Sequence, residues 1–548
     1  MTAPETREVK FLPLCAAGKY NMILSMTAST FAADDFAAAL RQDHGLGADD
    51  PRPVIEVRRG DLDRLVREAI AALKADGTKI FDRGGVAVRP VRLATPEVDH
   101  GIARDAGAMV LRPVSAAWLT HALARVAAWV RRDARAGEWR PTDPPERVAA
   151  ILADAPDLAA WPPIRAVVRH PLVMPNGEII AAPGYHAPTG ILVDVDNEWS
   201  IPETIDRDAA RDACDRLLEV LRHYPWATRA DQAVALSLLV TALARPVLPA
   251  APMHVITSPE PGCGKSMLAD VAAILATGAH APVMTWPEGR DADAESAKRI
   301  DAAQLAGDQI IAIDNIERPL EGAALAQLLT QGARRIRLLG ASTAVTVACT
   351  AMVVATGINL LVRGDLTRRT VVSRLDPGLE RPELRQIDQD LLAEVRARRR
   401  DLVIDALTIP VAYLRAGTPD VGVPPLGGYD AWSRMVRQAL VWLGETDPCN
   451  TMERTREDDT RRAATRAVYA AWHAALGEAP VTVADLLAQA RQDPDLAAAL
   501  RDAFGDDVTA RGVGAWCAYH RDRRVDGLVL RDAGISRTRA RRWLVERA

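Results

Sequence analysis

A glycine-containing run between two apolar segments constrains this chain more than any other feature. Residues 253–256 are apolar, residues 257–266 read TSPEPGCGKS, and residues 267–277 are amphipathic. This order predicts a strand, a loop and a helix. A loop of this kind directs backbone N–H groups and a helix N-terminus toward one point, where they favour phosphate. The sequence therefore predicts a site for a nucleoside triphosphate, with ATP as the expected ligand.

The predicted phosphate contacts come from the second half of the loop. Lys265 is expected to reach the β- and γ-phosphates, and the Ser266 hydroxyl is expected to hold Mg²⁺. The full pattern has glycine where this chain has Pro259, but that position mainly shapes the turn. The alternative is a glycine turn that enters a helix and carries one surface lysine. The predicted nucleotide-binding residues are Pro261, Gly262, Cys263, Gly264, Lys265 and Ser266.

A second apolar segment, residues 309–313, ends in an acid, Asp314. The interval from Lys265 leaves room for a helix, a strand and a second helix. An aspartate at the end of a neighbouring strand can hold the Mg²⁺ shell, so Ser266 and Asp314 are the predicted metal ligands. The alternative is a buried strand whose terminal aspartate caps a turn.

A third apolar segment, residues 352–356, leads to Asn359 and then to Arg368 and Arg369. An asparagine at a strand end can orient the attacking water or the γ-phosphate. An arginine beyond that strand can reach the γ-phosphate bound by a neighbouring subunit and stabilise transition-state charge. The alternative for both arginines is a solvated helix start or a salt bridge to Asp365.

Taken in order, these segments resemble four motifs of AAA+ ATPases. Lys265-Ser266 resembles Walker A and Asp314-Asn315 resembles Walker B. Residues 357–359 resemble sensor 1, and residues 365–369 resemble the arginine finger segment. The closest resemblance, over roughly residues 50–450, is to superfamily 3-like ATPases of phage- and plasmid-type primase-helicases.

The resemblance implies an α/β fold built on a P-loop AAA+-like core. An α/β accessory region is expected before the core, and a helical or winged-helix region after it. Six segments are expected along the chain. They are a loosely ordered leader (1–50), a small α/β accessory domain (51–145), a β-rich linker (146–204), the ATPase core (205–380), a helical domain (381–480) and a small helical or winged-helix module (481–548).

Two positions depart from the motifs of these ATPases. Helicases of this kind carry a second acid beside the Walker B aspartate to activate water, whereas this chain has Asn315. Glu317 is the nearest acid and is the candidate substitute. Assistance by a general base is typically worth ~10²–10⁴-fold in rate, so hydrolysis without it would be slow. Ile358 replaces one sensor asparagine. Residues 1–200 lack a convincing primase carboxylate cluster, so a separate primase is expected to supply priming.

Three arginines between the second and third strands are candidates for DNA contact. In the superfamily 3 helicases that the chain resembles, this interval carries a hairpin that lines a central pore and grips single-stranded DNA. Arg334, Arg335 and Arg337 suit phosphate contacts. The alternative is a basic edge strand that faces solvent. A second basic cluster, residues 537–542, is a weaker candidate. The net charge of −4 excludes chain-wide basicity as an argument for nucleic acid.

The cysteine spacing and the apolar stretches indicate the cellular compartment in which the protein is expected. None of the six cysteines forms a C-x-x-C pair, which indicates a reducing compartment. The longest apolar stretch, residues 233–244, is too short to span a membrane and fits a buried helix. We therefore expect a cytoplasmic protein without a membrane partner.

These patterns favour an ATP-dependent DNA helicase or translocase that acts in replication of a phage, plasmid or integrated element. Its partners would be single-stranded DNA or a replication fork. An arginine that acts on a neighbour's nucleotide implies a homo-oligomer such as a hexamer. The first alternative is an ATP-binding switch or scaffold that hydrolyses slowly and recruits replication or defence partners. The second is a P-loop kinase.

Overall fold

The computed structural model describes residues 50–547 apart from 160, 338–343, 380, 386–389, 458–459, 506–507 and 537–538. The predicted leader, residues 1–50, lies outside the described residues except for its last position. The chain divides into two compact units. The first comprises the described residues of Met1–Thr78 and Ser115–Ile151, and the second those of Lys79–Val114 and Leu152–Ala548. The predicted accessory domain, residues 51–145, is thus distributed over both units.

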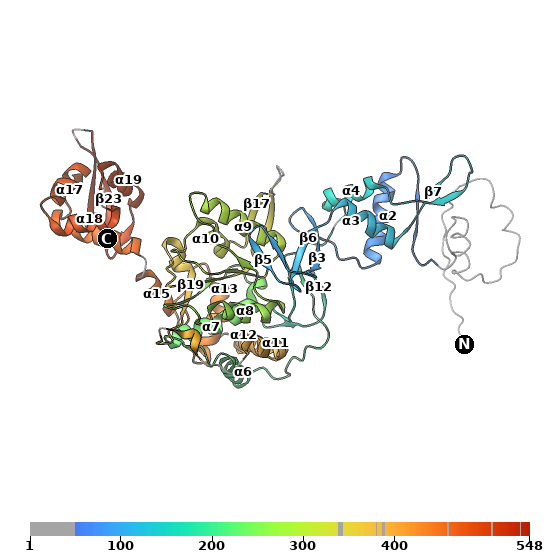
Figure 1. The fold of residues 1–548 in the computed structure, drawn as a ribbon, viewed down its shortest axis with the longest axis horizontal. Coiled ribbons are helices and arrows are strands. Elements are labelled where there is room, and N and C mark those ends of the chain that lie inside the picture. The colour runs from blue at the N-terminus through green and yellow to red at the C-terminus, as the bar shows by residue number, and fades with distance from the viewer. Residues whose placement is uncertain are drawn as a thin grey trace, which may run out of the picture. The chain divides into compact units, whose positions relative to one another are not determined.

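The first unit is a small α/β fold (Figure 1). Strand β1 (Val54–Val57) pairs in parallel with β7 (Ala128–Arg132), and β7 pairs antiparallel with β8 (Trp139–Pro141). Helices α2 (Leu62–Ala75), α3 (Ala116–Val126) and the start of α4 (Glu146–Asp154) complete it.

In this unit, helix α3 ends at Val126 and strand β7 begins two residues later. The apolar segment Ala128-Trp129-Val130 is buried where it pairs with β1. Burial in a sheet therefore determines its structure more than the preceding helical pattern does.

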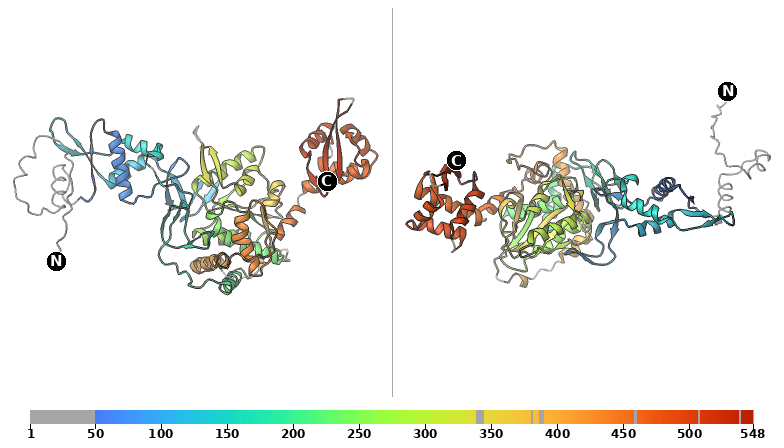
Figure 2. Two further views of the ribbon diagram at one scale, coloured as in Figure 1. Left: turned by 180° about the vertical axis from the view of Figure 1, so that it is seen from behind. Right: turned by 90° about the horizontal axis from the view of Figure 1, so that it is seen from above.

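A seven-stranded sheet forms the centre of the second unit (Figures 1 and 2). Five strands at one side of the sheet pair in parallel with one another, and the two strands at the other side pair antiparallel with their neighbours. Residues 97–104, upstream of the core in sequence, supply those last two strands. In spatial order the strands are β20 (Thr370–Arg374), β14 (Met253–Ser258), β19 (Met352–Ile358), β16 (Ile310–Ile313), β15 (Val283–Met284), β5 (Ile102–Arg104) and β4 (Glu97–Asp99).

Helices cover both faces of this sheet (Figure 1). Successive residues of β14 show the alternation of a strand, because Val255 belongs to one apolar core and Ile256 to the other. One core is formed with α7 (Arg229–Ala244), α8 (Lys265–Thr277) and α12 (Arg399–Arg415); the other is formed with α9 (Ala292–Ala306) and α10 (Ala323–Thr330). The sheet is therefore the middle layer of three, as is typical of α/β folds whose parallel strands are buried on both faces.

Helix α7 contains the long apolar stretch noted in the sequence. Every residue from Ala233 to Ala244 is buried, which confirms the prediction of a buried helix. Among the described residues, Arg229–Val247 is the one helical segment long and apolar enough to cross a membrane, and 83% of its most apolar window is buried inside the protein.

The remaining elements of the second unit lie before and after this core. Upstream are three small sheets: β2 (Phe81–Asp82), β3 (Ala87–Arg92) and β6 (Met109–Pro113); β9 (Ala166–Val168), β12 (Gly184–His186) and β13 (Ile191–Val193); and β10 (Leu172–Val173) with β11 (Ile179–Ile180). The other helices before the C-terminal module are α5 (Pro156–Ala159), α6 (Arg207–Val220), α11 (Leu391–Ala397), α13 (Asp430–Trp432), α14 (Gln438–Trp442) and α15 (Asn450–Glu457). A π-helical segment, Ser433–Arg437, links α13 to α14.

The C-terminal module, residues 460–547, has its own apolar core, which includes Tyr469, Trp472, Leu500 and Trp543. Four helices pack around a four-stranded sheet of order β21-β24-β23-β22 (Figure 2). The helices are α16 (Thr460–Leu476), α17 (Val483–Ala490), α18 (Pro494–Phe504) and α19 (Ala510–His520), and the strands are β21 (Val481–Thr482), β22 (Arg524–Val525), β23 (Leu528–Ile535) and β24 (Arg541–Arg547).

Candidate nucleotide-binding site

The loop between β14 and α8 has the backbone that its glycines allow. Strand β14 ends at Ser258 and α8 begins at Lys265, in the order that the sequence predicts. Gly262 and Gly264 have φ angles of 75° and 86°, in the left-handed region that side chains disfavour. A Cβ atom at Gly264 would also lie 3.3 Å from the ring of Tyr224. Glycine at this position therefore permits the left-handed backbone of the turn and leaves room for the ring of Tyr224.

Lys265 is the first residue of α8 and folds back over the loop. Its Nζ donates to the Ser258 Oγ at 2.6 Å and to the Glu260 carbonyl oxygen at 3.1 Å. Partial burial lowers the pKa of Lys265, while Cys263 and Asp314 act in the opposite direction. The lysine is thus a loop-bound cation at the N-terminus of a helix, where an anion is favoured.

Asp314 is the meeting point of three elements. The Ser266 Oγ on α8 donates to Asp314 Oδ1 at 2.8 Å, and the Thr356 Oγ1 on β19 donates to the same oxygen. Thr356 is buried, with 1% of its surface exposed. Its hydroxyl therefore fixes the carboxylate that follows β16 against the start of α8.

The donor set of this site fits Mg²⁺. A hydroxyl and a carboxylate are hard oxygen ligands, and Mg²⁺ usually takes one or two protein carboxylates and completes its shell with water and substrate phosphates. The described residues contain no cluster of three or more His, Cys, Asp or Glu that could hold a metal alone. Ser266 and Asp314 would therefore hold the ion together with a nucleotide.

The strand order corrects one expectation. Asp314 was expected on a strand next to β14, but β19 lies between β14 and β16. This insertion places Asn359, which follows β19, directly beside the loop. The Asn359 backbone N–H donates to the Ser258 carbonyl oxygen at 2.9 Å, and its φ angle is 46°. The asparagine is thus anchored by its backbone to the end of β14.

The two candidates for activating water differ chemically. Asn315 directly follows Asp314, is exposed, and has a φ angle of 54°, in a region that asparagine tolerates better than most residues. Its amide side chain cannot accept a proton at neutral pH. Glu317 is exposed, which leaves its carboxylate accessible to water.

The two predicted finger arginines have different surroundings. Arg369 is 13% exposed, and its guanidinium donates to the Ala326 carbonyl oxygen at 2.8 Å and to the Thr330 Oγ1 at 2.6 Å. Arg368 is 60% exposed and is paired with Asp365 at 2.6 Å. Ion pairs with both arginines outweigh the effect of desolvation and lower the pKa of Asp365. Arg369 is therefore bound to α10, whereas Arg368 faces solvent.

Both arginines lie far from the loop of their own chain. They end the 3-10 helix Gly364–Arg369, and β20 begins at the next residue. Because Thr370 pairs with Met253, the arginines lie at the start of β14, whereas the loop follows its last residue, Ser258. The six residues of β14 separate the two ends by about 17 Å.

A cavity of about 190 Å³ adjoins the loop and was not anticipated from the sequence. The phenol ring of Tyr224 stacks on Trp226, with centroids 5.1 Å apart, and its hydroxyl donates to the Gly264 carbonyl oxygen at 3.3 Å. The sequence could have indicated this site, because Tyr224 and Trp226 lie two positions apart in a chain that is only 4% aromatic. The cavity is lined by Val220, His223, Tyr224, Gly262, Cys263, Gly264, Met267, Pro382, Arg385 and Leu391.

The interval with three arginines forms a hairpin of β17 (Ala333–Arg337) and β18 (Ala344–Ala348). Alternation along β17 separates the arginines. Arg335 and Arg337 are exposed, whereas Arg334 is buried and paired with Asp301 at 3.1 Å. Two of the three predicted DNA contacts therefore face solvent, and the third holds the hairpin against α9.

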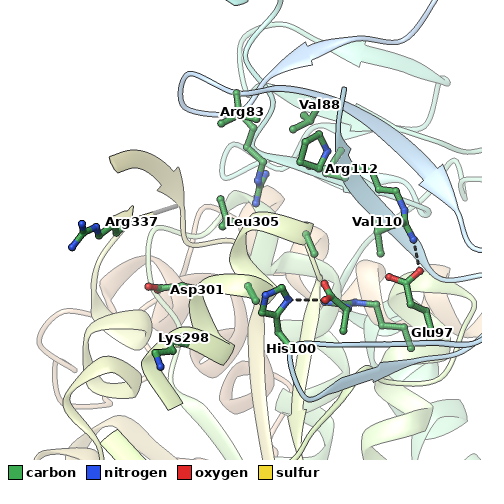
Figure 3. Close-up of a pocket in the computed structure, with 17 residues that line it drawn as sticks. Arg83, Val88, Glu97, His100, Val110, Arg112, Lys298, Asp301, Leu305 and Arg337 are labelled. Carbon is green, nitrogen blue, oxygen red and sulfur yellow. Dashed lines mark hydrogen bonds and ion pairs between the residues drawn. The ribbon is translucent and has the colours of Figure 1, made fainter. Parts of the chain in front are cut away.

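A larger cavity, of about 1010 Å³, lies beside this hairpin (Figure 3). Apolar side chains such as Val88, Val110 and Leu305 line it together with charged ones. Arg83, which is 2% exposed, extends along one wall and donates to the Arg165 carbonyl oxygen at 3.0 Å. No residue of the loop between β14 and α8 lines this cavity, so it is not part of the candidate nucleotide site.

No protein-family model and no curated protein matches the chain. Solved structures similar to it include the A form apo structure of the NrS-1 C terminal region, with a TM-score of 0.37, 9% identity, and coverage of 88% of this chain and 99% of that one. Another is SCCmec type IV Cch, an active helicase, with a TM-score of 0.32, 10% identity, and coverage of 85% and 97%. A third, the JCV helicase, has a TM-score of 0.20, 12% identity, and coverage of 47% and 74%.

Proposed function

We propose that this chain binds ATP with Mg²⁺ at residues 259–266 and hydrolyses it. One observation carries the proposal: the Ser266 hydroxyl and the Asp314 carboxylate meet at 2.8 Å, at the N-terminus of a helix that follows a glycine-containing loop. The loop and helix end favour phosphate, and the two oxygens suit Mg²⁺. When bound, the ion would neutralise charge on the transferred phosphoryl group.

The other residues of the site take roles that follow from their contacts. Lys265 exchanges its bonds to Ser258 and Glu260 for bonds to the β- and γ-phosphates. Thr356 holds the Asp314 carboxylate in place. Asn359, anchored beside the loop, orients the γ-phosphate or the attacking water. The cavity at Tyr224 adjoins the same loop and would take the nucleotide base.

Arg368 completes the site of a neighbouring copy. It is exposed, and it lies at the opposite end of β14 from its own loop, so a nucleotide within its reach belongs to another chain. This geometry supports a homo-oligomer, such as a hexameric ring, in which each arginine stabilises the transition state at the next subunit. Arg335 and Arg337 would contact the phosphates of single-stranded DNA.

These roles together favour an ATP-driven DNA helicase or translocase, and Asn315 favours a second candidate. Without a carboxylate beside Asp314, the attacking water depends on Glu317, and hydrolysis without a base would be slower by ~10²–10⁴-fold. In that case the chain would act as an ATP-binding switch that recruits replication or defence partners.

Phosphate release from ATP, measured with and without single-stranded DNA, separates these candidates. A motor shows turnover that DNA stimulates and that Lys265→Ala abolishes. Stoichiometric ATP binding without turnover in either condition would contradict the motor and support the switch. Failure of the wild type to bind ATP would contradict both.

Mixing two inactive variants tests the action between subunits. Lys265→Ala lacks the phosphate contact but keeps Arg368, and Arg368→Ala has the opposite defect. If the arginine acts on a neighbour, the mixture regains turnover, because a loop from one variant meets an arginine from the other. A mixture that stays inactive, while each variant still assembles, would contradict action between subunits.

A further inference from the structure

Charge is segregated within the C-terminal module. Residues 510–547, which contain α19 and the last three strands, have ten arginines and four acidic residues. The preceding residues, 478–507, have seven acidic residues and two arginines. One part of this small module is therefore basic and the other acidic, although the whole chain is close to neutral.

Ion pairs account for part of the basic charge. Arg531 bridges Asp522 at 2.7 Å and Glu546 at 3.0 Å, and Arg541 lies 3.6 Å from Asp532. A second group of arginines is exposed and has no acidic partner among the described residues. This group comprises Arg511, Arg523, Arg524 and Arg539. Each of these four carries an unneutralised charge in water.

Helix α19 presents one outward face with small residues at its centre. Arg511, Ala515, Ala518 and Tyr519 are exposed at helical spacing, whereas Val513 and Cys517 are buried on the opposite face. The helix contains no acidic residue. Two alanines between an arginine and a tyrosine allow a partner to approach the helix backbone closely.

The end of this face carries an aromatic ring with a cation above it. Tyr519 is 67% exposed, and the Cζ atom of Arg523 lies 4.0 Å from the centroid of its ring. This stacking orders an otherwise flexible arginine at the C-terminal end of the helix. Arg511 at the start and Arg523 beyond the end therefore flank the small residues.

A β-hairpin follows the helix in the same module. Strands β23 and β24 pair antiparallel, and Arg539 lies in their connection with a φ angle of 61°. Arg524 starts β22, the short strand that joins α19 to this hairpin. Unpaired arginines thus occur on the helix, on the adjoining strand and at the hairpin connection.

We propose that α19 and the β23–β24 hairpin form a docking surface for double-stranded DNA. The major groove, about 12 Å wide, admits an α-helix, and the acid-free face of α19 has the small residues that such an approach needs. Unpaired arginines at both ends of the face and on the hairpin suit the phosphates that flank a groove. Surfaces for single strands instead use several exposed aromatic rings, and this face exposes one, Tyr519.

Binding of the full-length chain to a short fluorescein-labelled duplex tests the proposal, with anisotropy followed over a range of salt concentrations and without ATP. The test variant combines Arg511→Ala, Arg523→Ala and Arg524→Ala. The control combines Arg491→Ala and Arg501→Ala, two exposed arginines in the acidic part of the module. Each lost phosphate contact lowers the slope of log affinity against log salt by about 0.9, so the test variant should lose up to about 2.7 in slope.

The proposal requires that the test variant bind the duplex more weakly and with a shallower salt dependence than the control and the wild type. Unchanged duplex affinity, or an equal loss in the control, would overturn it. A loss confined to single-stranded DNA would also overturn it and would assign the surface to that ligand. Because no ATP is present, failure here is distinct from failure of the proposed ATPase, which the Lys265→Ala assay tests.

Thermal unfolding of the test variant distinguishes a loss of DNA contacts from a loss of the fold. All three substituted side chains are exposed, so the midpoint should match that of the wild type. Tyr519→Ala provides an independent second variant, because it removes the ring that orders Arg523 and leaves every charge in place. It should weaken duplex binding by less than the triple substitution, and an unchanged affinity would contradict a role for this end of the helix.

Discussion

Replacing Arg368 and Arg369 by alanine, one at a time, should separate an arginine that serves a neighbour from one that holds the fold. Arg369 is 13% exposed and donates two hydrogen bonds to α10, at 2.8 and 2.6 Å. Hydrogen bonds from charged groups contribute about 1.5–3 kcal/mol each, and they are not fully additive. We therefore expect Arg369→Ala to lower the free energy of unfolding by about 2–4 kcal/mol.

Arg368→Ala should behave in the opposite way. Its side chain is 60% exposed and is paired with Asp365, and exposed pairs contribute about 0.2–1 kcal/mol. The free energy of unfolding should therefore change little. Turnover should fall by about 10³-fold or more, as is typical when a finger arginine is lost.

Two measurements on the same samples suffice: thermal unfolding and phosphate release. Since about 1 kcal/mol shifts the midpoint of a domain of this size by about 2–4 °C, Arg369→Ala should unfold roughly 5–15 °C earlier. Arg67→Ala is the matched control, because Arg67 is 71% exposed and pairs with Asp63 at 2.6 Å in the first unit. Early unfolding of Arg368→Ala, or wild-type turnover by that variant, would refute the reasoning.

Further substitutions at Gly357, Asp308 and His254 test other parts of the fold. Gly357→Ala places a Cβ atom against the Ile316 carbonyl oxygen in the turn after β16, closer than van der Waals contact allows, so it should lower both the unfolding midpoint and turnover. Gly427→Ala meets nothing within 4 Å and should change neither, and equal effects would contradict the clash. Asp308→Asn removes the charged partner of Arg104, whose side chain, like that of Asp308, is 2% exposed; urea unfolding should show a loss of about 3–5 kcal/mol, and a loss below about 1 kcal/mol would contradict a buried pair. Burial lowers the pKa of His254 to about 3, so only the unfolded chain takes up this proton between about pH 6.5 and 3, and stability falls as the pH falls through that window. At pH 5 this proton uptake lowers the free energy of unfolding by about 2 kcal/mol. The free energy of unfolding of His254→Gln should therefore fall by about 2 kcal/mol less than that of the wild type between pH 7 and pH 5. Equal falls in the two proteins would contradict this prediction.

Local features of the site could be predicted because they depend on residues close together in sequence. The order of strand, loop and helix at residues 253–277 follows from an apolar run, two glycines and an amphipathic segment. The contact between Ser266 and Asp314 also follows from motif order. Its geometry depends on Thr356, however, and nothing in the sequence marks that residue as the donor to Asp314.

Features that depend on tertiary packing could not be predicted in this way. The position of β19 between β14 and β16 is a property of the sheet. The contacts of Arg369 depend on α10, which comes from a distant part of the chain. The burial of Arg334 is different, because Ile336 lies two residues away on the same face of a strand. The two-residue period of a strand could therefore have predicted that Arg335 and Arg337 face solvent.

Arg368 and the loop after β14 lie at opposite ends of the central sheet, and this arrangement limits the symmetry of any assembly in which one chain's arginine reaches another chain's loop. The phosphate loop follows the last residue of β14, and Arg368 lies beside its first. A contact that brings one chain's arginine to another chain's loop joins two different surfaces, so it is heterologous and repeats from head to tail. An open row of subunits then always has one incomplete site, and only a closed ring completes every site. Turnover per subunit should therefore rise with protein concentration until the ring closes, and then stay constant.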